Sequence, residues 1–494
     1  MSSHFLNDLL ASFSRHSERQ AFVYRGQTIT HGELEARAGR CAAWLQGLGV
    51  GPGDRVALSG TDKLAFLVAH LGTLLAGGVS LPLNPRFTRD ELRYFLADSS
   101  PTVAVMGDGP RAIAEELRPT IPGLRAVVSD AAAAEAPAAQ PRPVTVSADD
   151  PCLLFYSSGT TGWPKGIVHT HASAATGLGA LRDCWRLGPD DVVVNVLPLF
   201  HVHGLSIATH QCLLAGGCQL TEDAFDPRRA LDLVGRATVF MAVPTIYYRL
   251  LEEPDFRQAA RSWQSVRLFT CGSAPVRAEV LPELESILGR PVINRYGMTE
   301  AHVITSLPLD GPWPQGSVGT PLVGIELRVS GEDGRPAAPG EVGSVWLRGP
   351  NLFREYWRKP DATRAALATG WFETGDLGSR DAAGFLTLVG RKNDLIITNG
   401  FNVYPQVVER VINDCPGVRE SAVLGVPDPR RGERVVAVVV RGGDLDEARL
   451  RAWWDERLVD YQRPREVVFV DSLPRNAMGK VLRRELRDRL APKG

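Results

Sequence analysis

The stretch with the most chemistry in this sequence is FYSSGTTGWPKG, residues 155–166. Its glycines free backbone N–H groups to point inward, its hydroxyls add donors, and Lys165 adds a compact charge suited to phosphate. The kinase-type pattern GxxxxGK[ST] is absent, because Pro164 precedes the lysine and Gly166 follows it. By itself the stretch leaves two alternatives, a phosphate-binding loop and a surface turn.

Three later stretches carry groups that suit a nucleotide. Residues 294–300, NRYGMTE, follow an apolar run and combine an aromatic ring for a planar base with Thr-Glu oxygens for magnesium. Residues 369–376, TGWFETGD, offer a carboxylate at an expected strand end for ribose hydroxyls, with a turn cap as the alternative. Residues 474–480, PRNAMGK, place a lysine on a glycine-hinged loop, where a plain surface lysine is the alternative.

Histidines gather in the middle of the chain. The segments HTH (169–171) and HVH (201–203) each place two histidines on one face if both segments are strands. A metal site is one interpretation, but no third cluster of ligands accompanies them. An acyl-gate or core role is therefore favoured.

These residues need a scaffold, and the pattern of the chain predicts an α/β fold. Helix-like and strand-like segments alternate over residues 1–130, which indicates parallel sheet. From residue 152 short apolar strands recur, and functional loops usually follow the carboxyl ends of such strands. Residues 131–145 are expected to form a mobile Ala/Pro surface loop, and glycine-punctuated strands over 315–390 suggest an antiparallel, barrel-like region. The end of the chain is expected to form a compact α+β unit.

Composition excludes several functions. The 494 residues carry 55 Lys+Arg against 56 Asp+Glu, so no global positive field exists for nucleic acid or an anionic membrane. Residues 64–83 are apolar but broken by glycines and Pro82, which predicts a buried helix running into a strand rather than membrane insertion. The seven cysteines form no CxxC pair, and no secretory signal is visible, so we expect reduced thiols in a cytoplasmic protein.

Several motifs in register carry a resemblance to a known family. YSSGTTGWPKG, RYGMTE, WFETGDLG, GRKNDLIITNGFNVYP and LPRNAMGK are similar to the core motifs of AMP-forming acyl-CoA synthetases, in the adenylate-forming (ANL) superfamily. The resemblance spans roughly residues 30–490. It implies a large N-terminal domain (1–392) of two α/β subdomains plus a small β-barrel region, followed by a small mobile α+β C-terminal domain (393–494). The hinge position, which usually carries Asp or Lys in this family, is Asn393 here.

The resemblance also implies a reaction and a set of roles. A carboxylate attacks the α-phosphorus of ATP to give an acyl-adenylate, and coenzyme A then displaces AMP. Magnesium is implied on Glu300 and Thr161, and the catalytic residues are Lys480, Glu300, Thr299 and His201. The residues expected to bind ATP or AMP are Ser157, Ser158, Gly159, Thr160, Thr161, Lys165, Gly272, Ser273, Ala274, Tyr296, Gly297, Asp376 and Arg391. The acyl pocket would use His203, Val243, Thr245 and Ala301, and the residues facing CoA would be Asn399, Gly400 and Phe401.

The acid itself stays open at this stage. PLFHVHGL, CGSAP and RYGMTE are most similar to malonyl-CoA synthetases and their fatty-acyl relatives. A malonate enzyme needs a cationic group for the second carboxylate. Arg249 is one candidate for that group, and the alternative is that Arg249 lies on a helix surface. The basic residue that usually precedes PGSVG is missing before Gly316-Ser317, so an aliphatic or aromatic monocarboxylate is equally open.

Two other functions compete with CoA ligation. The acceptor could be a carrier-protein pantetheine, or the chain could be a nucleotide-binding protein that has lost turnover. The expected partners are the carboxylic acid, ATP and CoA, with a homodimer as a further expectation and no nucleic acid.

Overall fold

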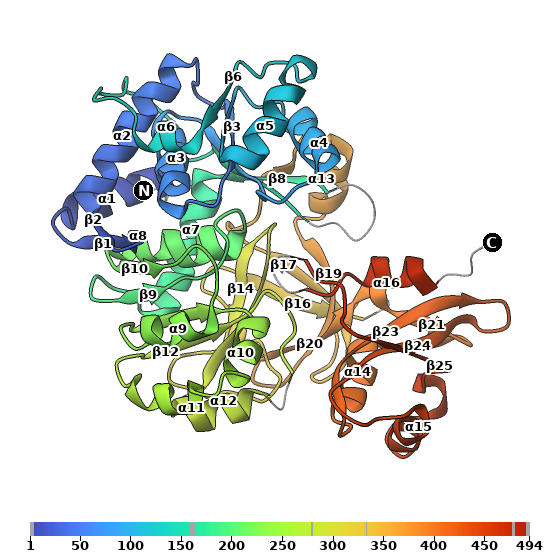
Figure 1. Ribbon diagram of the computed structural model, residues 1–494. Helices are drawn as coiled ribbons and strands as arrows, with labels where there is room; N and C mark the ends of the chain where they lie inside the picture. Colours follow the sequence, from blue (N-terminus) through green and yellow to red (C-terminus); the bar gives the residue numbers. More distant parts are fainter. Residues whose placement is uncertain (1–3, 158–163, 278–279, 332, 477–479, 491–494) are drawn as a thin grey trace.

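The computed structural model describes residues 4–157, 164–277, 280–331, 333–476 and 480–490 (Figure 1). Two large mixed sheets lie one above the other in Figure 1, and a third, antiparallel sheet connects them to a smaller α+β part at the C-terminal end of the chain. The fold confirms the predicted α/β class with an α+β end.

The first large sheet has the strand order β18-β8-β7-β4-β3-β5-β6. Strands β3 to β7 pair in parallel, whereas β8 pairs antiparallel with both β7 and β18. Its strands are β3 (Arg55–Ser59), β4 (Val79–Pro82), β5 (Val103–Met106), β6 (Ala126–Ser129), β7 (Pro151–Tyr156), β8 (Gly166–Thr170) and β18 (Glu355–Tyr356). The helices of this part are α2 (His31–Gly47), α3 (Lys63–Leu75), α4 (Arg89–Ser99), α5 (Asp108–Leu117), α6 (Asp130–Ala134) and α13 (Pro360–Leu367).

The second large sheet has the order β15-β14-β13-β12-β11-β9-β10-β1-β2, parallel from β13 to β1 and antiparallel at both edges. Its strands are β1 (Gln20–Tyr24), β2 (Gln27–Thr30), β9 (Val192–Val194), β10 (Cys218–Thr221), β11 (Val239–Ala242), β12 (Leu268–Cys271), β13 (Val292–Met298), β14 (His302–Ser306) and β15 (Thr320–Pro321). Its helices are α1 (Phe5–Arg15), α7 (His171–Trp185), a π-helix (His203–His210), α8 (Gln211–Ala215), α9 (Pro227–Val234), α10 (Pro244–Leu251), α11 (Phe256–Ala259) and α12 (Val280–Leu288).

The remaining strands form two smaller sheets. The four-stranded antiparallel sheet holds β16 (Glu326–Ser330), β17 (Gly343–Arg348), β19 (Phe372–Arg380) and β20 (Leu386–Arg391). The C-terminal sheet holds β21 (Ile396–Thr398), β22 (Phe401–Val403), β23 (Val418–Asp428), β24 (Gly432–Arg441) and β25 (Glu466–Val470), with α14 (Pro405–Asn413), α15 (Glu447–Asp455) and α16 (Arg483–Leu490). The predicted boundary at residue 393 falls in the short 3₁₀ turn Lys392–Asp394 between them, and it stays a prediction.

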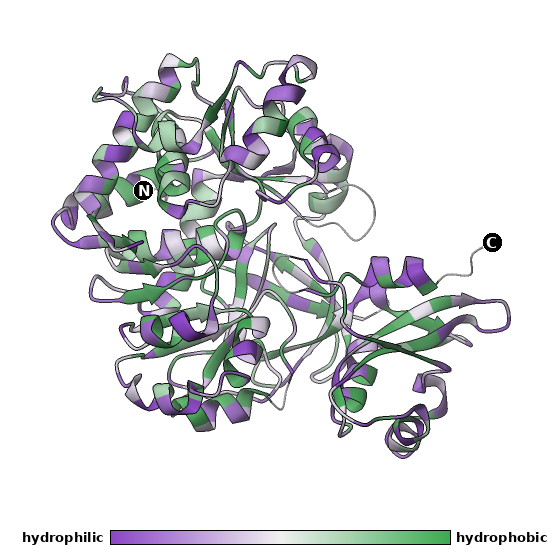
Figure 2. Cartoon of the chain, viewed as in Figure 1, coloured by the Kyte–Doolittle hydropathy of each residue, from purple (hydrophilic) through white to green (hydrophobic). Residues whose placement is uncertain are grey.

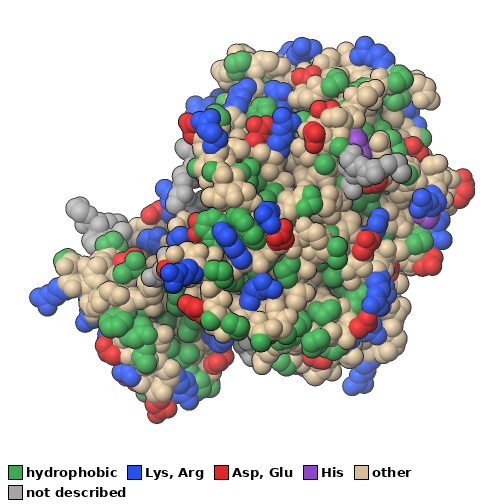
Figure 3. Space-filling model, turned by 180° about the vertical axis from the view of Figure 1, so that it is seen from behind, with side chains coloured by type: hydrophobic (Ala, Val, Ile, Leu, Met, Phe, Trp, Pro, Cys, Tyr) green, Lys and Arg blue, Asp and Glu red, His purple; other side chains and the backbone are tan. Residues whose placement is uncertain are grey.

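Hydrophobic burial explains this layering. In Figure 2 the central strands are green and the outward faces of the covering helices are purple, as expected when sheets are buried on both faces. Helix α3 is buried along nearly its whole length and leads into β4, which confirms the helix-to-strand prediction for residues 64–83. None of the helices that the structure describes combines the length and the apolar composition of a membrane-spanning segment. Acidic and basic side chains are interspersed over the face seen in Figure 3.

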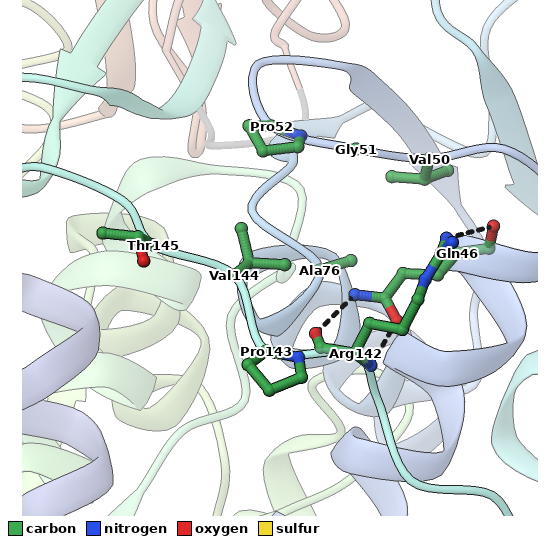
Figure 4. A pocket seen from close by; sticks show the side chains of 9 residues that line it. All are labelled: Gln46, Val50, Gly51, Pro52, Ala76, Arg142, Pro143, Val144 and Thr145. Atoms are coloured by element: carbon green, nitrogen blue, oxygen red, sulfur yellow. Dashed lines mark hydrogen bonds between the residues drawn. The ribbon is translucent and has the colours of Figure 1, made fainter.

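The Ala/Pro segment is more ordered than the sequence predicted. Residues 130–134 form α6, and Arg142 exchanges hydrogen bonds with Gln46, including one of 2.8 Å from the Arg142 N–H to Gln46 Oε1. Gln46 and Arg142, together with Pro52 and Val144, line a hollow of about 340 Å³ (Figure 4). Polar backbone groups of the segment find partners in α2, which is why its composition misled the prediction.

Candidate active site

The glycine-rich stretch connects β7 to β8, an antiparallel pair near one edge of the first large sheet, with β18 beyond β8. The Ser157 N–H donates to the Lys165 carbonyl over 3.2 Å, and the Tyr94 hydroxyl donates to the Pro164 carbonyl over 2.7 Å. The predicted phosphate ligands Ser158, Gly159, Thr160 and Thr161 lie outside the described residues. The Lys165 ammonium lies 4.9 Å from the centre of the Tyr356 ring, a cation–π contact that directs it toward the next group of residues.

That group is built around Asp376, which the sequence placed at a strand end. The structure corrects this: Asp376 lies in the middle of β19, directly opposite Arg391 on β20. Arg391 Nε contacts Asp376 Oδ1 at 3.0 Å, and the Tyr296 hydroxyl donates to Asp376 Oδ2 over 2.5 Å. The register between β19 and β20 shifts just after this pair, between Leu377 and Gly378. Three predicted nucleotide residues therefore meet at one carboxylate.

Glu300 lies beside this cluster, between β13 and β14. It is buried, and burial raises the pKa of its carboxyl group, while the Arg391 charge opposes that rise. The Tyr356 hydroxyl donates to Glu300 Oε1 over 3.4 Å. One carboxylate that keeps most of its lone pairs fits magnesium, which takes oxygen ligands from one or two carboxylates plus substrate phosphates. Thr161, the second predicted ligand, lies outside the described residues.

Lys480 comes from the C-terminal part and reaches the same cluster. Its loop is held by a hydrogen bond of 3.0 Å from the Lys480 N–H to Asn476 Oδ1 and by a β-bridge between Arg475 and Val481. Burial lowers the pKa of Lys480 to about 8, and the neighbouring charges that modify it belong first to Arg391 and then to Asp376. The structure thus brings Lys480 together with Arg391 and Asp376, which lie about 90 and about 100 positions earlier in the chain.

The predicted acyl side lies next to the π-helix. His203 Nδ1 and Ser273 Oγ are 3.1 Å apart, and the His203 N–H donates to His201 Nδ1 over 3.3 Å. The interpretation of HTH and HVH as strand-face pairs is wrong: His203 begins the π-helix, His169 lies on β8, and His171 begins α7. Among the described residues, no three His, Cys, Asp or Glu side chains form a metal-binding group.

The other predicted acyl and nucleotide residues are spread around the same region. Val243 and Thr245 stand at the start of α10, Ala301 precedes β14, and Gly272 to Ala274 follow β12. Gly297 lies on β13, where a Cβ would come within 2.2 Å of the His302 carbonyl oxygen, so only glycine fits there.

Sequence reasoning missed Arg295, which points into this region. Its side chain is buried (3% exposed), and it lies over Gly272, where an added Cβ would meet Arg295 Nε at 2.7 Å. Arg295 Nη2 is 3.5 Å from Ser273 Oγ, and Nε has no hydrogen-bond partner among the described residues. The sequence offered one signal of its burial, because this arginine directly follows the apolar strand residues in PVINRYG. Arg249, the earlier candidate, is instead exposed at the end of α10 and stacks on Phe225.

The predicted CoA-facing residues form the tip of the β21–β22 hairpin. Asn399 and Gly400 adopt φ values of 51° and 80°, the paired left-handed conformations that an Asn-Gly turn provides. Phe401 is 53% exposed and stacks on Tyr461 with ring centroids 4.7 Å apart. The turn therefore displays an aromatic surface on the C-terminal part.

Comparison with known proteins agrees with this geometry. A family described as AMP-binding enzyme matches residues 9–357, and its C-terminal domain matches residues 407–480. The chain is similar to a feruloyl-CoA synthase from Amycolatopsis sp (37% identical, 95% of each chain) and to the mitochondrial malonate–CoA ligase ACSF3 of Mus musculus (34%, covering 91% of this chain and 84% of that one). Among solved structures it resembles ATP-bound MatB from Rhodopseudomonas palustris, with a TM-score of 0.94, 39% identity and 99% coverage of each chain.

Proposed function

The chain belongs to the AMP-binding enzyme family and is an AMP-forming CoA ligase that uses ATP, and from this premise we propose that its acid is a short dicarboxylate of the malonate type. One observation carries the proposal, the buried Arg295 without a carboxylate partner among the described residues. Burial lowers the pKa of Arg295 to about 10, so the guanidinium is still charged at neutral pH.

A buried cation without a counter-charge costs several kcal/mol. Substrate is the natural source of that counter-charge, because a carboxylate accepts two hydrogen bonds from one guanidinium. His203 and Ser273, which contact each other beside Arg295, add neutral polar groups to the same end of the site. A purely aliphatic tail would bury Arg295 further and leave it unpaired, which disfavours fatty acids.

The two half-reactions distribute over the described residues as follows. Arg391 and Asp376 would hold the ribose, Glu300 the magnesium, and Lys480 the meeting point of carboxylate and α-phosphate. A cation at that point stabilises charge that develops in the transition state. His201 would gate the acyl side, and Lys165 would bind the outer phosphates. The small C-terminal domain from residue 393 would then turn so that Asn399 to Phe401 face the CoA thiol.

The test is AMP formation with ATP, Mg²⁺ and CoA across malonate, methylmalonate, succinate, propionate, butyrate and ferulate. We expect malonate or methylmalonate to lead. Arg295→Leu should lower kcat/KM for that diacid by about 100-fold, since breaking a buried charged pair costs about 3 kcal/mol, and should spare butyrate. Arg249→Leu is the matched control on the surface and should change the kcat/KM of neither the diacid nor butyrate. Faster turnover of butyrate or ferulate by the unaltered enzyme would reject the dicarboxylate.

A homodimer and a cytoplasmic location complete the proposal. The seven cysteines are free thiols, which suits a reducing compartment. Light scattering on the purified chain measures its oligomeric state.

A further inference from the structure

The turn that carries Thr299 and Glu300 is held at three successive carbonyl oxygens by groups from elsewhere in the chain. His169 Nε2 lies 2.7 Å from the Thr299 carbonyl, the Phe353 N–H donates to the Glu300 carbonyl over 2.8 Å, and Asn351 Nδ2 donates to the Ala301 carbonyl over 2.7 Å. Two of these three anchors are side chains, His169 and Asn351, and both are fully buried.

The geometry fixes the protonation of His169. A carbonyl oxygen only accepts, so Nε2 must carry the proton and donate it, which leaves Nδ1 as an acceptor. Ser173 supplies the matching donor, with its Oγ 3.1 Å from His169 Nδ1. Ser173 also accepts from the Thr170 N–H in the capping box that begins α7, so the orientation of the imidazole is linked to a helix start.

A second histidine holds the ring from the side. His302, at the start of β14, packs edge-on against His169 with ring centroids 4.2 Å apart. His302 has a left-handed φ of 55° and packs closely against α7, where a Cβ added at Gly177 would lie 3.5 Å from the His302 Cβ, in ordinary van der Waals contact. The imidazole of His169 is therefore restrained on both nitrogens and against His302.

We propose that His169 and Asn351 are positioning residues that clamp the Thr299–Glu300 turn for adenylate formation. The proposal rests on the proposed roles of Thr299 and Glu300 at the α-phosphate and magnesium. It differs from them because neither clamp residue contacts the reacting groups. Fixing the carbonyls on either side fixes where the Glu300 carboxylate and the Thr299 hydroxyl point, and a small misplacement of such groups is costly.

The experiment compares His169→Gln with His169→Leu. The Gln amide keeps a donor near the Nε2 position, whereas Leu keeps bulk and loses the donor. ATP–pyrophosphate exchange is measured with the best acid of the panel. His169→Leu should lower kcat by about tenfold or more and raise the Mg²⁺ concentration needed for half-maximal exchange. The KM for the acid should stay nearly unchanged. Gln should recover kcat to within about threefold.

Two further measurements complete the design. The rate of thioester formation from purified acyl-adenylate should be unchanged in His169→Leu. The rise in melting temperature that MgATP causes without acid should be smaller in His169→Leu than in the unaltered enzyme. Equal losses of exchange in both variants, in step with their melting temperatures, would overturn the proposal, as would full exchange activity in His169→Leu. If His169→Leu does not fold, Asn351→Leu removes the donor to the Ala301 carbonyl and is judged by the same measurements. If the proposed dicarboxylate is wrong, another acid of the panel will be the best substrate. The ratio of the exchange rates of His169→Gln and His169→Leu should not change.

Discussion

The Tyr296 hydroxyl donates a 2.5 Å hydrogen bond to Asp376 Oδ2, while Arg391 contacts the other oxygen of the same carboxylate at 3.0 Å. Tyr296 lies on β13 of the second large sheet, and its partners lie on neighbouring strands of the four-stranded sheet. This one carboxylate therefore connects two sheets at the place where a ribose is expected.

Tyr296→Phe tests this connection. Removing a hydroxyl that donates to a carboxylate should lower the free energy of unfolding by about 2 kcal/mol. The KM for ATP should rise about three- to tenfold, because Asp376 loses one of the two groups that orient it. Tyr24→Phe is the control, since Tyr24 also donates to a carboxylate, Asp223, at another place: it should affect stability but not KM. An unchanged KM in Tyr296→Phe would contradict the prediction.

Lys480 should make adenylate formation dependent on pH. Its pKa is lowered to about 8, so the charged form disappears as pH rises through that value, and the exchange rate should fall about tenfold per unit above it. Lys480→Ala should lower exchange by about 100-fold or more and spare thioester formation from acyl-adenylate. Lys480→Arg stays charged, so its exchange rate should be lower than that of the unaltered enzyme but independent of pH up to about pH 9.5. A flat profile in the unaltered enzyme would argue against this role.

Glu300→Gln should raise the Mg²⁺ concentration needed for half-maximal exchange by about tenfold, because a neutral amide is a poorer ligand for a hard cation. Glu326→Gln is the control, since that exposed carboxylate pairs with Arg348 on the surface of the four-stranded sheet. Titrating Mg²⁺ at fixed ATP measures the effect. The same Mg²⁺ dependence in Glu300→Gln as in the unaltered enzyme would remove Glu300 from the metal site.

Buried histidines should make the fold sensitive to acid. Burial lowers the pKa of His70 to about 3 and that of His171 to about 4, and it holds the pKa of His210 well below its usual value. Unfolded histidines titrate near 6.5, so below that pH the unfolded chain binds more protons. Stability should be complete above pH 6.5 and fall by about 1.4 kcal/mol per unit for each histidine below about pH 6.

Urea unfolding at pH 7.5 and 5.5 measures this loss. His70→Gln keeps a polar group beside Ser80 Oγ and the His210 ring and removes one titrating group, so its loss over that range should be smaller. Equal stability of the unaltered chain at the two pH values would refute the account.

The sequence could locate the elements that depend on local pattern. The buried helix α3 follows from an apolar run that glycines and Pro82 interrupt, and the Asn-Gly turn of the β21–β22 hairpin follows from backbone preference. It misjudged residues 131–134, the helical part of the predicted loop, and the position of Asp376. A short helix that packs on α2 and α3 and a polar residue within a strand both depend on partners distant in the chain.

By itself the sequence indicated the reaction class, through the resemblance of its motifs to those of AMP-forming acyl-CoA synthetases. The glycine-rich loop, RYGMTE, TGD and the terminal lysine are contiguous motifs, so their residue types and their order are visible in the sequence itself. Only the tertiary structure decided which arginine is buried beside Ser273 and His203 and which groups hold the Thr299–Glu300 turn. Burial of Arg295 and the approach of His169 to Thr299 arise where β8, β12, β13 and the π-helix pack together, and residues 130 positions apart meet only after those sheets have formed.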